Sequence, residues 1–79
     1  MIPSLGDIWK INNSTNGCVI NVNDEVIELI CKDFITKKVF VFKEKLIKSK
    51  DINERFSLFC KHYEYKGKSK IIDLLFETE

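Results

Sequence analysis

The sequence contains no alanine and no glutamine, and it has one proline and one arginine, Arg55. Alanine is the best intrinsic helix former, so its absence weakens the case for long helices. Isoleucine, lysine, asparagine and phenylalanine together supply 35 of the 79 residues. Because β-branched and aromatic side chains favour pleated, half-buried strands, the composition predicts a mainly β protein.

Long apolar runs are also missing, since no stretch approaches the ~20 residues that a transmembrane helix needs. The first four residues have neither the basic start nor the apolar stretch of a secretory signal. We therefore expect a soluble cytoplasmic protein with no membrane partner. The length predicts one domain, 1–79, with a single core.

The sequence has an odd number of cysteines, Cys18, Cys31 and Cys60, and no two of them have the C-x-x-C spacing. In a reducing compartment they are expected to be small buried hydrophobes, with no structural disulfide. One histidine and three scattered cysteines do not supply the ligands of a zinc site. The three glycines are isolated and form no phosphate-binding loop, so the sequence predicts neither metal nor cofactor.

Cys60 and His62 are the one pair that suggests nucleophilic catalysis. On a strand they would share a face with Glu64, which could orient the imidazole. In the alternative, Cys60 belongs to the core and the other two emerge near the end of the strand. We adopt the alternative, which leaves no catalytic residue and predicts that the protein is not an enzyme.

Alternation of apolar and polar residues, broken by turn signals such as Asn16-Gly17, predicts a series of short strands. The expected strands cover residues 7–11, 18–22, 25–32, 38–43 and 55–65. Polar residues between the last two allow a short helical turn around 46–54, and 66–69 is expected to be a turn. The segment 71–77 fits either a strand or a helix, with a hairpin strand preferred.

The apolar positions of these strands define the expected core. Residues 38–43 are apolar on both faces, which indicates a central strand. The predicted core residues are Ile27, Leu29, Val39, Val41, Phe56 and Leu58.

The opening residues Gly6-Asp7-Ile8-Trp9, followed by successive hairpins, resemble the start of an SH3-like barrel of the KOW or Tudor type. This resemblance implies a closed or nearly closed barrel of five or six strands. The same four residues resemble the first strand of MazF/PemK-type toxins, which are ribonucleases. Those toxins place a catalytic arginine shortly after the second strand, whereas the arginine here is Arg55, far downstream.

Charge is segregated along the chain although the net charge is only +1. Residues 1–36 carry two lysines against five acidic residues, and 71–79 carry three acidic residues alone. Residues 37–70 carry eleven basic against four acidic residues. A basic segment with interspersed aromatics can either contact a phosphate backbone or surround the apolar anchors of a protein interface. The candidate binding residues are Phe59, Lys61, Tyr63, Tyr65, Lys66, Lys68 and Lys70.

The sequence favours a small non-enzymatic binding protein whose target is a host or cellular protein. A nucleic-acid-binding module that uses residues 37–70 is the first alternative, and a MazF-like ribonuclease is the second. Lysines lack the forked donor with which arginine reads bases, which counts against the first alternative. The abundant isoleucine, lysine, asparagine and phenylalanine have AT-rich codons, a bias associated with bacteriophages and low-GC bacteria. The expected role is therefore that of a phage accessory protein that binds and modulates a protein of the host cell.

Overall fold

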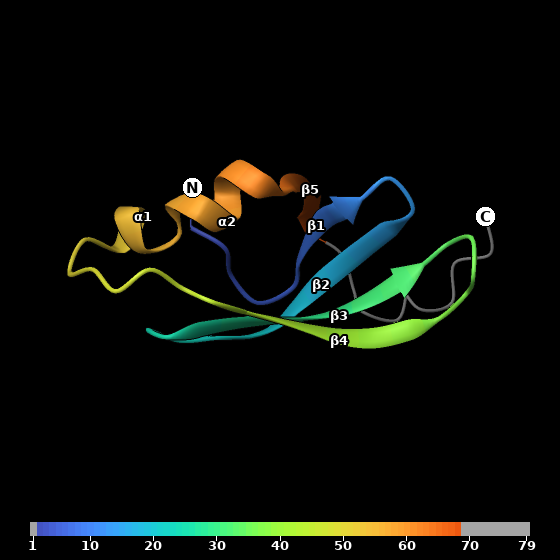
Figure 1. The fold of residues 1–79 in the computed structure, drawn as a ribbon, viewed down its shortest axis with the longest axis horizontal. Helices are drawn as coiled ribbons and strands as arrows, with labels where there is room; N and C mark the ends of the chain where they lie inside the picture. The colour runs from blue at the N-terminus through green and yellow to red at the C-terminus, as the bar shows by residue number, and fades with distance from the viewer. Residues whose placement is uncertain (1, 69–79) are drawn as a thin grey trace.

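The computed structural model describes residues 2–68, which form five strands and two short helices. The strands make one antiparallel sheet in the order β4-β3-β2-β1-β5 (Figure 1). The elements are β1 (Asp7–Asn12), β2 (Thr15–Val22), β3 (Val26–Asp33), β4 (Val39–Lys45), α1 (Ile52–Arg55), α2 (Ser57–His62) and β5 (Glu64–Lys68). The expected all-β class is confirmed.

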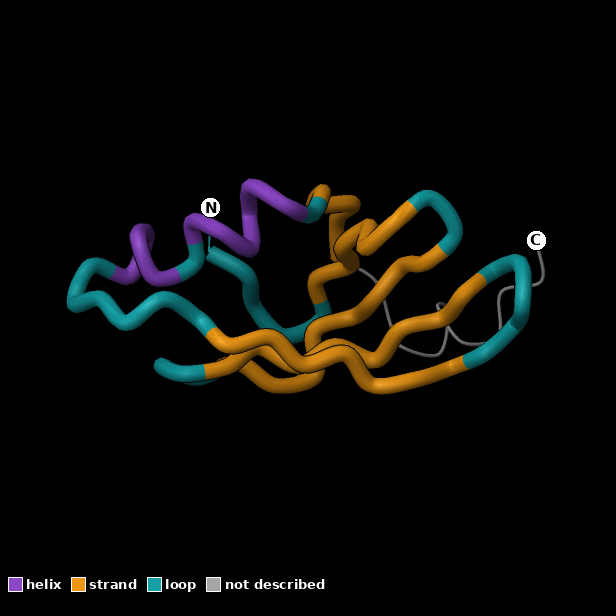
Figure 2. Tube along the Cα trace, viewed as in Figure 1, coloured by secondary structure: helices purple, strands orange, loops and turns teal. Residues whose placement is uncertain are grey.

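The first four strands form a meander, and the last strand returns to pair with the first. Both helices lie in the connection from β4 to β5, on one side of the sheet (Figure 2). We call the side of the sheet under these helices the inner face, and the opposite side the outer face. Among residues 2–68, β4 and β5 pair with only one neighbour each, so they form the two edges of the sheet.

The core lies between the inner face and α2. Its buried residues come from four elements, and β3 supplies three of them at alternate positions, as its sequence pattern predicts. The cluster comprises Trp9, Val19, Ile27, Leu29, Cys31 and Phe59. Gly17 opposes both Trp9 and Cys31 in the ladder, and a Cβ atom at this position would lie 2.7 Å from the Cys31 sulfur. The glycine therefore leaves the room that the neighbouring large side chains occupy.

The strand predicted over residues 55–65 is wrong, because most of this segment is helical. Asp51 caps α1 by accepting a hydrogen bond from the Asn53 amide at 2.9 Å. The buried aromatics Phe56 and Phe59 then recur at helical rather than strand spacing. Leu58, a predicted core residue, points away from this face and is 49% exposed.

The prediction of a central strand at residues 38–43 is also wrong, since β4 is an edge strand. Phe42 packs against the core from the inner face, opposite Leu29. Val39 and Val41 face the other way and are 49% and 57% exposed, so neither is a core residue. Of the six predicted core residues, Ile27, Leu29 and Phe56 are buried.

Two strand boundaries differ from expectation because turns lie elsewhere. β2 begins at Thr15, three residues early, since the chain turns at Asn13-Ser14 instead of at Asn16-Gly17. The turn expected at 66–69 is replaced, up to Lys68, by β5, in which Gly67 has a φ of +112°. The expected element at 71–77 lies outside the described residues.

Leu29 and Leu58 provide a matched test of this packing. Leu29→Ala should lower the free energy of unfolding by about 2–5 kcal/mol, because it leaves a cavity in the core. Leu58→Ala should change it by less than about 0.5 kcal/mol, because half of the side chain is already in water. Urea denaturation of both variants measures the difference. Equal losses at the two positions would contradict the helical register of α2.

Candidate interaction surfaces

The predicted binding residues do not form one exposed face. Phe59 is 1% exposed and packs edge-on against Trp9, with ring centroids 4.9 Å apart. It is therefore a core residue, and its prediction as a surface anchor is wrong. Tyr65 is 36% exposed, and its ring packs edge-on against Trp9 with ring centroids 5.5 Å apart. Lys70 lies outside the described residues.

Tyr63 is half-buried between the core and the β4 edge. Its ring contacts Phe59 and Phe42, and its hydroxyl donates a 2.8 Å hydrogen bond to the Glu44 carboxylate. Burial, together with this hydrogen bond and the carboxylate charge, raises the pKa of Tyr63 to about 12. Tyr63 thus joins the α2–β5 corner to β4, and its primary role is structural.

Two of the predicted lysines already have acidic partners. Lys68 Nζ lies 3.0 Å from the buried Asp7 carboxylate and also donates hydrogen bonds to Ser4 and to the Leu5 carbonyl. This pair fixes the end of β5 against the start of β1, so Lys68 serves the fold. Lys66 lies 3.9 Å from Glu64 in an exposed and correspondingly weak pair.

Lys61 and Tyr63 do come together, in a shallow groove of about 270 Å³ at the end of β1. The groove is mainly polar and is lined by Lys10, Ile11, Asn12, Asn13, Lys61, His62, Tyr63 and Glu64. Its lysines, Lys10 and Lys61, come from β1 and α2 and are 51 positions apart in the sequence. Sequence reasoning missed Lys10, because it lies outside the basic stretch. This groove can accept a small anionic group.

The edge of β4 that pairs with no strand of residues 2–68, called the free edge below, is a second candidate surface. The amide of Asp33 donates to the Lys38 carbonyl, and the amide of Leu46 donates to the Glu25 carbonyl. Because hydrogen-bonded positions alternate along an antiparallel strand, the even-numbered residues between them face β3. The backbone groups of the odd-numbered residues, including Val39 and Val41, therefore point to the open edge.

Apolar side chains flank this open edge. Val39, Phe40 and Val41 are consecutive and are 49%, 42% and 57% exposed. A pocket of about 440 Å³ lies at the other end of β4, lined by Asp24, Glu25, Val26, Lys43, Lys45, Leu46 and Lys48. Among residues 2–68, this edge thus combines backbone groups without a strand partner, apolar contact area and a nearby pocket lined by three lysines and two acidic residues.

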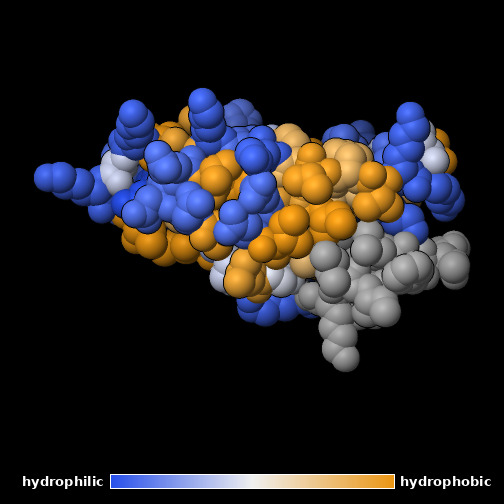
Figure 3. All heavy atoms as spheres, turned by 90° about the horizontal axis from the view of Figure 1, so that it is seen from below, coloured by the Kyte–Doolittle hydropathy of each residue, from blue (hydrophilic) through white to orange (hydrophobic). Residues whose placement is uncertain are grey.

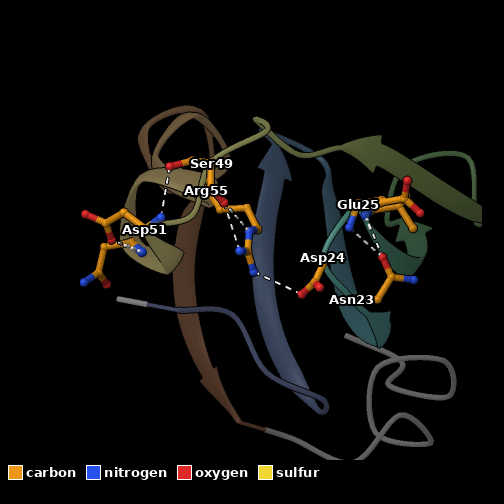
Figure 4. Close-up of polar contacts among 8 residues, drawn as sticks. Asn23, Asp24, Glu25, Ser49, Asp51 and Arg55 are labelled. Carbon is orange, nitrogen blue, oxygen red and sulfur yellow. Dashed lines mark hydrogen bonds and ion pairs between the residues drawn. The ribbon is translucent and has the colours of Figure 1, made fainter.

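Arg55 holds the loop after β4 against the β2–β3 turn. Its Nε and Nη2 atoms donate to the Ser49 carbonyl at 3.2 and 2.9 Å, and Nη1 donates to Asp24 at 3.1 Å (Figure 4). The guanidinium is largely buried, whereas Asp24 is exposed. These contacts give Arg55 a structural role.

Cys60 and His62 do not form the pair that a shared strand face would have produced. Both belong to α2, where residues two positions apart point to different sides. Burial raises the pKa of the Cys60 thiol, which opposes formation of a nucleophilic thiolate. Burial also raises the pKa of Cys31 to about 11.

Comparison of the chain with protein-family models, curated proteins and solved structures gives no match in any of the three. Within residues 2–68, no helix has the length and apolar character needed to cross a membrane. In the same part of the chain, no three His, Cys, Asp or Glu side chains gather as metal ligands would.

The Tyr63–Glu44 contact can be tested by titration. In Glu44→Gln the pKa of Tyr63 should fall below about 12 while staying above 10, because the charge is lost but burial remains. Since folding raises this pKa, the stability it contributes is present below pH 10 and is lost as the pH rises towards 12. Ultraviolet difference absorbance of the phenolate, recorded in a Tyr65→Phe background, isolates Tyr63. An unchanged titration in Glu44→Gln would show that the contact is absent in solution.

Proposed function

We propose that this chain is a non-enzymatic binding protein whose target is a host or cellular protein that docks on the free edge of β4. The main observation in its favour is that the consecutive side chains of Val39, Phe40 and Val41 are exposed, next to backbone groups that pair with no strand of residues 2–68. Edge strands of small domains are usually short, charged or covered, because an open edge pairs with other chains. The first four residues of this seven-residue strand are apolar and only the last three are charged, so its apolar part is expected to have a partner.

The chemistry of the edge indicates an extended, acidic segment as the partner. An added strand would hydrogen-bond with the odd-numbered residues of β4 and place alternate side chains over the exposed valines. Lysines stand at both ends of β4, at positions 37, 38, 43, 45 and 48. Acidic residues flanking an apolar segment would match this arrangement and speed association.

We retain the resemblance to SH3-like barrels as part of the proposal, and note that the sheet of residues 2–68 keeps two edges, so the expected closure of a barrel is not seen among them. A four-stranded meander, a helical crossover and a fifth strand that returns to β1 are compatible with that architecture. The architecture alone does not define a function, so the argument for binding depends on the β4 edge.

Nucleic-acid binding is the second candidate, and the groove containing Lys10, Lys61 and His62 favours it. Two observations weigh against it. Lys68 is already paired with a buried carboxylate, and the net charge of the whole chain is only +1. Phosphate-dominated binding generally requires a stronger basic field.

Val41→Pro tests the edge directly. Proline at this position removes an amide that points away from β3, so the internal ladder should remain intact. Partners are captured from a nuclease-treated host lysate, and their affinity is measured at about 0.15 M ionic strength. Val41→Pro should weaken binding at least about tenfold, the loss expected from one or two interface contacts. Val41→Thr, which keeps the amide, and Lys61→Glu in the groove should bind nearly as wild type.

The opposite pattern would favour nucleic acid. If nuclease releases all captured partners, and Lys61→Glu rather than Val41→Pro removes binding, the edge proposal is wrong. Circular dichroism of each variant verifies that the sheet is retained.

A further inference from the structure

The pocket at the end of β4 lies between two segments that hydrogen bonds hold in position. One wall is the β2–β3 turn with the start of β3, and the other is the end of β4 with the loop after it. The Asn23 side chain accepts hydrogen bonds from the amides of Glu25 and Val26 at 2.8 and 2.9 Å. Arg55 connects Asp24 to the loop after β4, and so joins one wall to the other (Figure 4). The walls of this pocket of about 440 Å³ are therefore held in place without a ligand.

Apolar and hydrophilic side chains meet at this end of the sheet. Val26 and Leu46 are half-buried and supply the apolar part of the pocket lining. Figure 3, which views the molecule from the side opposite the helices, shows hydrophilic side chains beside apolar ones at the end that carries the β2–β3 turn. A concave apolar surface buries most of the surface of a group that fills it, so the pocket favours an apolar group.

The charged residues of the rim fall into two groups. Lys43 and Asp24 already have partners, in ion pairs of 3.2 and 3.1 Å. Within the described part of the chain, Lys45, Lys48 and Glu25 form no ion pair. Two positive charges without a partner thus stand against one negative charge, which favours an anionic group beside the apolar one.

The pocket is within reach of a segment docked on the free edge. Val41 and Lys45 are four positions apart on β4, so their side chains point to the same face of the sheet. Val26 is opposite Lys45 in the register and shares that face. Four positions along a strand span about 14 Å. In an added strand, the residue four positions from the one over Val41 therefore lies beside Lys45, next to the pocket.

We propose that this pocket determines which segments bind, by taking a large apolar side chain four positions from the residue over Val41, with an acidic residue next to it. The inference rests on the proposed docking at the β4 edge and adds a requirement on the sequence of the docked segment. The apolar side chain lies against Val26 and Leu46, and the carboxylate lies near Lys45 and Lys48. Backbone pairing along β4 gives affinity for any extended segment, whereas the pocket gives specificity.

Binding of naphthoate, an apolar ring system with one carboxylate, tests the chemistry of the pocket without a partner. Naphthoate should shift the amide resonances of Val26 and Leu46 in heteronuclear NMR spectra of the full chain. It should also bind more tightly than naphthamide, which has the same rings and no charge.

Removal of the two lysines without a partner separates the charge from the apolar contact. Lys45→Gln combined with Lys48→Gln should weaken naphthoate about fivefold, because exposed charge contacts contribute little each, and should leave naphthamide unchanged. Lys50→Gln combined with Lys61→Gln removes the same charge outside the pocket. This matched control should bind both ligands as the wild type does.

The partner captured on the β4 edge then tests specificity. Val26→Thr keeps the shape of the side chain but places a hydroxyl in the apolar lining, and should weaken both the partner and naphthoate about tenfold. Val41→Pro should weaken the partner and leave naphthoate unchanged, because the pocket walls do not use that amide. Naphthoate should displace the partner at a lower concentration than naphthamide.

The outcomes separate the pocket from the edge. If naphthoate and naphthamide bind equally, or neither shifts the two amides, the pocket inference is wrong and the edge proposal is unaffected. The same holds if the partner binds Val26→Thr as tightly as the wild type. Partner binding that survives Val41→Pro but falls in Val26→Thr would overturn the edge proposal, and with it the spacing of four positions.

Discussion

The contact between Trp9 and Phe59 is the interaction on which the rest of the structure depends. It joins strand β1 of the sheet to the short helix α2, and both side chains are 1% exposed. The indole Nε1 atom has no hydrogen-bond partner among the described residues, a cost of about 1–3 kcal/mol for a buried donor. The aromatic packing must offset that cost. Without it, helices of four and six residues would have little stability of their own.

This contact also begins a series of ring contacts that connects the two candidate surfaces. From Trp9, ring contacts continue through Phe59 and Tyr63 to Phe42 on β4. The inner side of β4 is thereby held against the core, while its odd-numbered backbone groups remain directed outward. The groove beside Lys10 is lined in part by Tyr63, the ring that contacts Phe42. The protein therefore presents an apolar edge and a polar groove from one continuous core.

Local pattern predicted the fold class and β3 well, because alternation with period two gives the buried face directly. Ile27, Leu29 and Cys31 illustrate this. The same procedure failed at 55–65, where apolar residues are dense enough to fit either period. The helix α2 there has no side-chain cap, and packing of Phe59 on Trp9 favours it over a strand. It failed at β4 for another reason. Whether a strand lies at an edge depends on which strands pair, and local sequence does not encode that.

The candidate surfaces were less predictable, again because local sequence does not encode which distant segments come together. Lysine content identified a basic stretch, but the Asp7–Lys68 ion pair joins residues 61 positions apart and removes one lysine from that set. Phe59 and Tyr65 were both predicted to be exposed aromatics, yet Phe59 is buried in the core and Tyr65 is 36% exposed.

The pairing of β5 with β1 has a consequence for how the chain acquires its structure. β2, β3 and β4 join by tight turns and can associate early, but β1 gains its second neighbour only when residues near 68 are available. Pairing β1 with β5 closes a long loop, and the chain loses conformational entropy before favourable contacts form. This step is therefore slow, and a high folding barrier is expected. During synthesis, β1 cannot gain this second neighbour until β5 has left the ribosome. Until then, the apolar edge of β1 stays open to other chains, and rapid release or a chaperone would be the cell's protection against misassembly.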